Sequence, residues 1–577
     1  MKIQITLFYT IFALIINHSC KPVVQSDMSL INGKVITVDS RFTIEEAVAI
    51  KGDTILALGT TGEINKFTGN KTQIIDLKGQ TVIPGLIDSH LHPEPASLSE
   101  IDEEIPDVHT IDQLLEWIRN ESSLKKNGEW IIFPKFFSTR LTEMRQPSLK
   151  ELDVSAPENP VFLNGSFGGM INSEAMRISG ISAGSDHPGI IKDPATGSPT
   201  GFIRASAFNL LKIPSQKPLS YLQIKKALKE MISRYNRYCI TGLFSGTGDF
   251  ESIKLYQDLA SDNELTARIY QNILMKTPDK ITKESIDKIL NSYPGKTGSG
   301  DKWVRTGSLK VFMDGGILTG TAYLQEPWGE KAGEIFGIDD PSYRGIINFT
   351  RDDLITIVSA ANEYNWSFTA HATGDGSVNM LLDVYDEVNK SKSITERRFS
   401  IIHGNFFSHD AIKKMAELGV YANVQPAWFY KDADAMLSIL GNERIKSFHP
   451  NKAMIDAGVI INGGSDHMVK WDADASINPY NPFLAMWSII TRKTERSSTI
   501  LPDEAVSREE ALRIYTINNA YASFEESIKG SIEPGKLADM AIITDDFLTC
   551  PVDKIKGIES LITIVGGKIV YRSEFFK

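Results

Sequence analysis

The stretch TVIPGLIDSHLHPEP, residues 81–95, decides how the rest of the chain is interpreted. Its apolar residues predict a buried strand, and Pro84-Gly85 marks a bend where that strand is entered. Because residues two apart in a strand project to one face, His90 and His92 are expected to emerge side by side at its end. Neutral imidazole is the commonest metal ligand in proteins. The stretch therefore predicts a strand that ends at a metal site, although two histidines on a surface loop would give the same pattern.

Length and composition limit the classes of protein to consider. The chain has 577 residues, more than one core of roughly 100–200 residues accounts for, so at least two structural units are expected. The formal net charge of -11 argues against a nucleic-acid partner, which would need a basic face. Three cysteines occur, Cys20, Cys239 and Cys550, without the CxxC spacing typical of cysteine zinc sites.

Residues 1–20 have the pattern of a lipoprotein signal peptide. Lys2 gives a positive start, residues 3–16 are nearly all apolar, and Ser19-Cys20 follows. The apolar run is shorter than the ~20 residues of a membrane-spanning helix. We expect an exported protein, periplasmic or at the cell surface, held to a membrane only by a lipid anchor at Cys20. A plain secretory signal is the alternative, because Asn17 and His18 stand where small or apolar residues are more usual.

Both ends of the remaining chain consist of short strand-like runs and turns. Asn32-Gly33 is a strong hairpin signal near the start, and Gly566-Gly567 is a similar one near the end. We expect residues 21–83 and 525–577 to form one small β domain built from both termini.

Between these ends, segments with helical spacing alternate with apolar strands, which predicts parallel βαβ units. The expected strands are 86–92, 240–245, 267–274, 309–313, 366–371, 399–403, 420–424 and 459–466. Eight such units form a (β/α)8 barrel, an α/β fold whose sites lie at the C-terminal ends of the strands. We assign residues 84–524 to this barrel. Residues 94–235 are too long for one connection and are expected as an insertion that covers the mouth and influences substrate choice.

Metal-ligating side chains recur at the predicted strand ends. They are His90 and His92 after the first strand, Lys310 in the fourth, His371 and His403 at the fifth and sixth, and Asp466 at the eighth. Imidazole and carboxylate ligands suit zinc, and also manganese, iron or cobalt. Lys310 stands in an apolar strand, where an unpaired ammonium is costly. Either carbon dioxide has converted it to a carbamate that bridges two cations, or it forms a salt bridge with Asp314.

This ordered set resembles the amidohydrolase superfamily, and within it amidohydrolase family 3, which includes YtcJ-like proteins and N-substituted formamide deformylases. The segments that carry the resemblance are 82–92, 194–201, 310–315, 371–375, 402–403, 464–466 and 532–539. The resemblance covers nearly the whole chain after the signal. It implies a metal-bearing TIM-like barrel with a small β-sandwich made from both ends.

The resemblance also implies roles for the candidate ligands. His90, His92 and Asp466 would hold the more buried ion, His371 and His403 the more exposed one, and a carbamylated Lys310 would bridge them. One or two divalent ions, zinc before others, are implied. Asp466 is placed to take a proton from the attacking water and pass it to the leaving nitrogen.

Three departures from the family pattern concern the pocket. The segment 166–171 lacks a histidine that relatives often carry, and Ala205 and Ile402 each stand where a glutamate is common. The metal set is intact, so these departures bear on the substrate and not on the chemistry.

Three further residues are weaker candidates for substrate contact. His467 follows Asp466 directly, and Trp428 either floors an apolar pocket or packs against the insertion. Asp375 begins a helix, where it serves as a cap or supports the site. We expect a hydrolase that cleaves a non-peptide carbon–nitrogen bond of a small molecule with metal-activated water. The alternatives are a deaminase or cyclic-amide hydrolase of the same superfamily, or a non-catalytic binding protein; the sequence indicates no oligomeric state.

Overall fold

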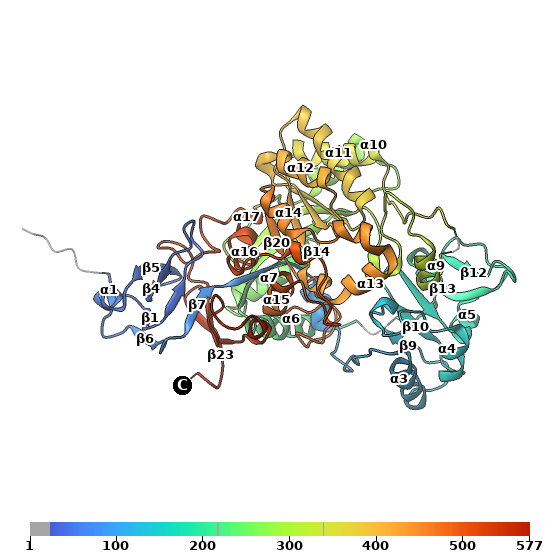
Figure 1. Cartoon of the computed structure of the whole chain (residues 1–577), viewed down its shortest axis with the longest axis horizontal. Helices are drawn as coiled ribbons and strands as arrows, with labels where there is room; N and C mark the ends of the chain where they lie inside the picture. The colour runs from blue at the N-terminus through green and yellow to red at the C-terminus, as the bar shows by residue number, and fades with distance from the viewer. Residues whose placement is uncertain (1–23, 216–217, 339, 577) are drawn as a thin grey trace, which may run out of the picture.

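Three parts follow one another along the long axis of the molecule (Figure 1). A β-sandwich lies at one end, a barrel in the middle and the insertion at the other end. The structure is a computed structural model that describes residues 24–215, 218–338 and 340–576. The predicted signal peptide, residues 1–20, and Cys20 lie outside the described residues.

The middle part is built on eight parallel strands. In chain order they are β8 (Leu86–Leu91), β14 (Ile240–Gly248), β15 (Arg268–Leu274), β16 (Val304–Phe312), β17 (Phe368–Ala372), β18 (Ser400–His403), β19 (Tyr421–Val424) and β20 (Ile461–Gly463). Each strand pairs in parallel with its sequence neighbours. This arrangement confirms the predicted (β/α)8 barrel.

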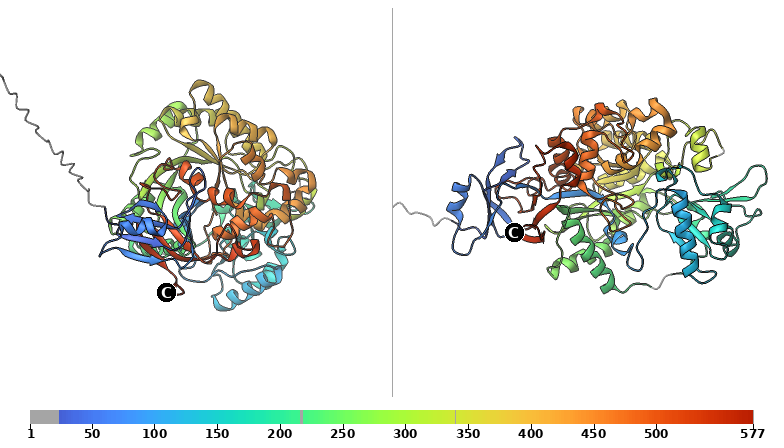
Figure 2. Two further views of the ribbon diagram at one scale, coloured as in Figure 1. Left: turned by 60° about the vertical axis from the view of Figure 1, so that its left-hand side comes forward. Right: turned by 60° about the horizontal axis from the view of Figure 1, so that its bottom comes forward.

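Amphipathic helices cover the outside of the strands (Figure 2). They include α6 (Tyr221–Asn236), α7 (Phe250–Ser261), α8 (Lys283–Ser292), α10 (Arg351–Glu363), α11 (Asp375–Ser391), α12 (His409–Leu418), α14 (Asn451–Asp456), α16 (Arg508–Ile514) and α17 (Ile517–Ala522). In α10 the buried residues Leu354, Ile357 and Val358 recur at helical spacing, and Thr350 caps its N-terminus. None of the described helices combines the length and the apolar character needed to cross a lipid bilayer.

The barrel closes where its two edge strands, β8 and β20, meet. The N–H of Asp466 donates to the carbonyl of His90 at 2.6 Å, and the N–H of His92 donates to the carbonyl of His467 at 2.7 Å. A Cβ on Gly464 would lie 2.6 Å from the nitrogen of His90, so glycine permits this close approach. Closure therefore joins segments that lie 374 residues apart in the chain.

Strands from both termini form the β-sandwich. One sheet has the order β5-β4-β1-β6 and the other β23-β22-β21-β7-β2-β3. Their bounds are β1 (Met28–Ile31), β2 (Lys34–Ile36), β3 (Ile44–Glu45), β4 (Ala47–Lys51), β5 (Thr54–Gly59), β6 (Gln73–Asp76), β7 (Thr81–Pro84), β21 (Met540–Ile543), β22 (Ser560–Val565) and β23 (Lys568–Arg572). Leu30 and Ile50 of one sheet share a core with Val82 and Ile542 of the other.

The turn at Asn32-Gly33 does not form a hairpin, so that prediction is wrong. β1 pairs with β4 and β6, whereas β2 pairs with β3 and β7 in the other sheet. Asn32 has φ 59°, so the tight turn is real, but it carries the chain from one sheet to the other. A turn signal specifies a reversal and does not decide whether the flanking strands pair. Gly566-Gly567 does join the antiparallel pair β22 and β23.

The insertion contains a sheet of its own, and the apolar run Val161-Phe162-Leu163 alone predicts one of its strands. Its order is β12-β13-β11-β10-β9. The strands are β9 (Ile131–Phe133), β10 (Val161–Asn164), β11 (Gly168–Ile171), β12 (Ile190–Lys192) and β13 (Pro199–Arg204), and α3 (Ile111–Leu124), α4 (Leu149–Ser155) and α5 (Ser173–Ser179) accompany them. The insertion lies on the opposite side of the barrel from the β-sandwich, as the right-hand view of Figure 2 shows.

A buried ion pair joins the barrel to the β-sandwich. Arg268 begins β15, and Asp539 directly precedes β21. Arg268 Nε lies 2.5 Å from Asp539 Oδ2, and its Nη2 lies 2.8 Å from Oδ1. Asp539 Oδ1 also accepts from the N–H of Gly566 at 2.8 Å.

Replacing this carboxylate, as in Asp539→Ala, is expected to lower the free energy of unfolding by about 3–5 kcal/mol, because a buried guanidinium loses its partner. Chemical denaturation measures the change. The matched control is Asp386→Ala, which breaks a 2.9 Å pair with exposed Lys390 and should cost less than about 1 kcal/mol. Equal losses of stability in the two variants would contradict a stabilising role for the buried pair of Arg268 and Asp539.

Candidate metal centre

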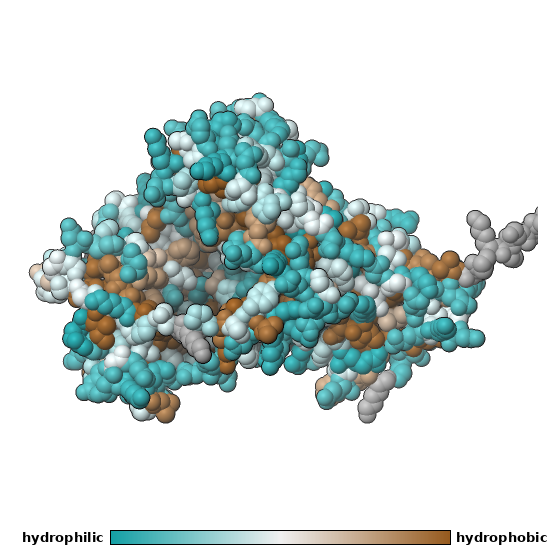
Figure 3. All heavy atoms as spheres, turned by 180° about the vertical axis from the view of Figure 1, so that it is seen from behind, coloured by the Kyte–Doolittle hydropathy of each residue, from teal (hydrophilic) through white to brown (hydrophobic). Residues whose placement is uncertain are grey.

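Six side chains from five of the barrel strands and the residues that follow them line one cavity at the barrel mouth. His90 lies in β8, Lys310 in β16, His371 in β17 and His403 at the end of β18, while His92 and Asp466 follow β8 and β20. All six border a cavity of about 480 Å³. Seen from behind, the surface is hollowed beside the insertion, and hydrophobic residues gather around the hollow (Figure 3).

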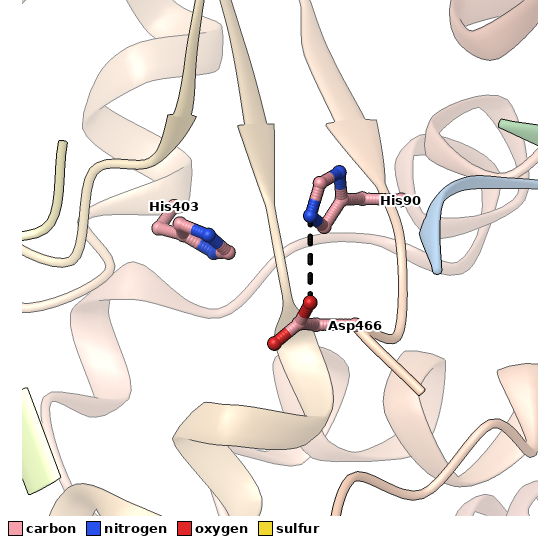
Figure 4. Close-up of side chains that lie close together, drawn as sticks. All are labelled: His90, His403 and Asp466. Atoms are coloured by element: carbon pink, nitrogen blue, oxygen red, sulfur yellow. Dashed lines mark ion pairs between the residues drawn. The ribbon is translucent and has the colours of Figure 1, made fainter. Parts of the chain in front are cut away.

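Three of these side chains form the tightest group. His90, His403 and Asp466 each offer one ligand atom, and these atoms lie within 4.8 Å of one another (Figure 4). Asp466 Oδ1 lies 3.4 Å from His90 Nε2 and 3.1 Å from His92 Nε2. The ring of His371 lies 4.5 Å from that of His403, measured between centroids. The imidazoles and the carboxylate therefore converge on one small volume.

Partners behind the rings orient the imidazoles. The Nδ1 of His403 lies 2.7 Å from Gln425 Oε1, an acceptor, so Nδ1 carries the proton and Nε2 keeps its lone pair. His371 Nε2 donates to the carbonyl of Gly315 at 3.0 Å, which leaves its Nδ1 as the lone-pair atom. Such partners behind a ligand fix the ring and its tautomer.

Burial keeps the rings in the form that binds metal. It lowers the pKa of His90 and of His371 to about 3 and that of His403 well below its usual value. The three rings are therefore neutral at pH 7. Burial by itself would raise the pKa of Asp466, but hydrogen bonds from His90 and His92 bring it well below the usual range, so the carboxyl is ionised.

Two of the candidate ligands sit on strained backbone. His403 has φ 74° and Asp466 φ 55°, in the left-handed region that costs roughly 1 kcal/mol or more for a residue with a Cβ. Asp466 is held there by its bond to His90 and by Asn478, whose Nδ2 donates to the Asp466 carbonyl at 2.8 Å. Strain of this kind gathers at functional sites, where the surrounding fold enforces it.

Lys310 does not pair with Asp314, so the salt-bridge alternative is wrong. The Asp314 carboxylate instead accepts from the N–H of Gly374 at 2.9 Å and from Ser377 Oγ at 2.7 Å. Lys310 Nζ lies 3.3 Å from His90 Nε2, and no carboxylate oxygen of the described residues lies within 4.0 Å of it. Asp314 follows the end of β16 and turns toward the start of α11, away from Lys310. Burial lowers the pKa of Lys310 to about 7.

The chemistry of these donors fits a divalent cation. Neutral imidazoles and an ionised carboxylate are the nitrogen and oxygen ligands that zinc and related ions take. Acceptor lone pairs that crowd one another in a buried space repel unless a cation or protons lie between them. Which of the six side chains bind a metal, which metal they bind and how many ions are present stay predictions.

Of the three weaker candidates for substrate contact, one lines the cavity and two do not. Trp428 lines the cavity and stacks on His403, with centroids 4.9 Å apart and ring planes at 8°. His467 is buried outside the cavity lining: its Nδ1 pairs with Tyr235 Oη at 2.9 Å and its Nε2 donates to the carbonyl of Lys470 at 2.6 Å. Asp375 accepts from the N–H of Gln325 at 2.9 Å and also lies outside that lining. Of the three candidates, Trp428 is the one placed to contact a substrate.

Several residues of the site were missed by the sequence reasoning. Gln425 directly follows β19, so its place at a strand end was a usable signal. Phe167 lies in the segment where relatives often carry a histidine, and its ring packs 5.5 Å from that of His371. Lys135 of the insertion lines the same cavity, and an isolated lysine in a loop gives no signal in the sequence.

Known proteins are similar in sequence to this chain over most of its length. It is 29% identical over 565 residues to an N-substituted formamide deformylase of Arthrobacter pascens, covering 94% of this chain and 98% of the relative. It is 25% identical over 539 residues to the putative amidohydrolase YtcJ of Bacillus subtilis, covering 91% and 96%.

Solved structures give the same fold. An uncharacterised metal-dependent hydrolase from Pyrococcus furiosus superposes with a TM-score of 0.64 at 23% identity, covering 90% of this chain and all of that one. The model of the amidohydrolase family matches residues 73–571, which include the barrel, all six candidate ligands and the strands β7, β21 and β22 of the β-sandwich. The chain belongs to the amidohydrolase family.

Proposed function

We propose that this protein is a metal-dependent hydrolase of a non-peptide carbon–nitrogen bond in a small molecule. The observation that carries the proposal is the convergence of His90, His403 and Asp466 within 4.8 Å beside a cavity at the barrel mouth. Membership of the amidohydrolase family and the likeness to a formamide deformylase support an amide-like bond as the target. The retained donors argue against a purely binding role.

The proposed roles of the donors follow their placement. His90, His92 and Asp466 would hold one divalent ion, His371 and His403 a second if two are present, and zinc is the ion that this set favours. Such an ion lowers the pKa of water from 15.7 toward ~7 and polarises a carbonyl oxygen. The chain supplies orientation: Gln425 and the Gly315 carbonyl hold the rings, and Trp428 walls one side.

Asp466 is the proposed proton carrier. Its Oδ1 faces His90 and His92, and Asn478 Nδ2 donates to its Oδ2 at 3.2 Å, so the carboxylate has one fixed orientation. Ionised, it can accept the proton of the attacking water and then deliver it to the leaving nitrogen.

Metal content tests the proposal directly. Purified protein is expected to hold at least one equivalent of a divalent metal and to lose amide hydrolysis when a chelator removes it, because no side chain alone acidifies water sufficiently. The substitution His403→Asn should lower metal content by elemental analysis, whereas His109→Asn, at an exposed histidine beside Asp107, should not. A fully active protein free of metal would refute the proposal.

The carbamate on Lys310 is part of the same proposal. The amine is buried and has no carboxylate within 4.0 Å among the described residues. Burial lowers its pKa to about 7, which favours the neutral amine relative to an exposed lysine. The lone pair of a neutral amine forms the N–C bond to carbon dioxide, one C=O π bond opens and one N–H proton is released to solvent. The product is a carbamate anion beside His90.

Protein prepared under ¹³C-labelled carbon dioxide is expected to show a carbamate carbon resonance that persists after the free label is removed. The resonance should be absent from Lys310→Met and present in Lys150→Met, whose exposed lysine serves as the control. A signal that survives in the Lys310 variant would place the label elsewhere.

The localisation proposal rests on the sequence of residues 1–20 alone. We expect the full-length protein in a bacterial host to fractionate with membranes through a lipid on Cys20. Replacing that residue, as in Cys20→Ser, should release the protein to the soluble fraction, because the lipid on Cys20 is the proposed attachment to the membrane. Equal membrane retention of both forms, measured by immunoblotting of fractions, would contradict it.

A further inference from the structure

Away from the candidate ligands, the cavity wall is mostly apolar and holds one charged side chain. Its walls include Phe137, Phe167, Phe312, Leu318, Trp428 and Val469. Beyond the six candidate ligands, Lys135 is the charged side chain among the described residues that line it. Lys135 follows β9 of the insertion, so the insertion places a cation opposite the barrel's own groups.

The Lys135 ammonium has no ionic partner in the fold. The side chain is buried, with 8% of the residue exposed. It donates to Ser166 Oγ and contacts Met468 Sδ at 2.9 Å. No carboxylate oxygen of the described residues lies within 4.0 Å of its Nζ. The one carboxylate in the cavity wall, Asp466, is engaged by two imidazoles.

A neighbouring cation of the insertion has a carboxylate partner. Arg140, five residues further on, contacts both oxygens of buried Asp432, with Nε at 2.7 Å and Nη2 at 2.9 Å. Lys135 has no such carboxylate, although a buried and unpaired ammonium is costly. The fold therefore leaves this one positive charge directed at the space where a substrate would lie.

The partner of Lys135 is itself held in a strained position. Ser166 has φ 68°, in the left-handed region, and its N–H donates to Asn164 Oδ1 at 2.8 Å. This turn presents the Ser166 hydroxyl to the ammonium. A non-glycine residue kept in this conformation at a cavity wall is the kind of strain that accompanies function.

We propose that Lys135 binds a carboxylate of the substrate, so that the substrate is a small amide with an apolar body and a single negative charge. The inference rests on the proposed function and adds the substrate class to it. In a cavity with little polar surface, a carboxylate pairs with the ammonium more favourably than in water. The aromatic wall, Phe167, Phe312 and Trp428, is placed to contact the apolar body.

A neutral amide does not satisfy the same site. It would fill the apolar space but leave the ammonium buried without a counter-charge, which selects against it. The insertion thus acts as a specificity element, while the barrel supplies the hydrolytic groups.

The test compares two acyl anilides that differ only in a ring carboxylate or a neutral carboxamide. The metal-containing wild-type protein is expected to prefer the acid. Lys135→Met keeps the length of the side chain and removes its charge. In this variant, the ratio of kcat/KM for the carboxylate substrate to kcat/KM for the carboxamide substrate should fall about tenfold or more. Lys135→Arg should retain part of the preference, and the exposed-site control Lys150→Met all of it. A ratio unchanged within about twofold in Lys135→Met would overturn the proposal.

A binding measurement separates this proposal from the proposed function. Calorimetric titration with 4-methylbenzoate, which has no bond to hydrolyse, should show binding to wild type that weakens about tenfold or more in Lys135→Met. Equal affinity in both proteins would place the anion at the metal and overturn the proposal, as would no binding to wild type. Lys135-dependent binding in a protein that hydrolyses no amide would refute the hydrolase and leave the anion site standing.

Discussion

The backbone hydrogen bonds that close the barrel between β8 and the segment after β20 are the constraint on which the site depends. The N–H of Asp466 donates to the carbonyl of His90, and the N–H of His92 donates to the carbonyl of His467. The first and last strand ends are therefore joined at three of the candidate ligands. Gly464 allows this close approach, and Gly246 of β14 leaves room for the His90 ring. A Cβ on Gly464 would meet the nitrogen of His90, and a Cβ on Gly246 would lie 2.5 Å from the His90 ring. The hydrogen bonds that close the barrel therefore also position the candidate ligands.

Burial then sets the chemistry of the side chains that closure gathers. Desolvation lowers the pKa of His90 and His371 to about 3, so both rings are neutral and able to bind a metal. The same desolvation lowers the pKa of Lys310 to about 7 and that of Lys135 to about 8. The barrel lysine lies among the imidazoles, and the insertion lysine faces the open cavity. In our proposal, the barrel of this member of the amidohydrolase family supplies the hydrolytic groups, and the insertion contacts the substrate.

The strand ends could be predicted from sequence because apolar runs and helical spacing have fixed periods, and each run stops at a polar residue. The candidate ligands followed from that rule. The left-handed backbone of His403 and Asp466 could not, because a backbone angle imposed by tertiary contacts leaves no mark on composition. The separation of His467 from the cavity is equally a matter of direction, which sequence adjacency to Asp466 does not give.

Two other differences between the sequence predictions and the structure also arise from long-range contacts. The insertion's strands are three to six residues long and lack a clear alternation, so four of the five gave no periodic signal. Asn32-Gly33 marked a turn correctly, yet pairing of the strands on either side depended on β4, β6 and β7, which lie elsewhere in the chain. Local patterns predicted local geometry, and long-range pairing decided the rest.

The most direct measurement of the central claim is anomalous X-ray scattering from crystals of the purified protein, recorded on either side of the absorption edge of the metal that it contains. The account predicts a strong anomalous peak between His90, His403 and Asp466 at the barrel mouth. A metal peak elsewhere with none at these side chains, or a protein that crystallises active without any such scatterer, would contradict it.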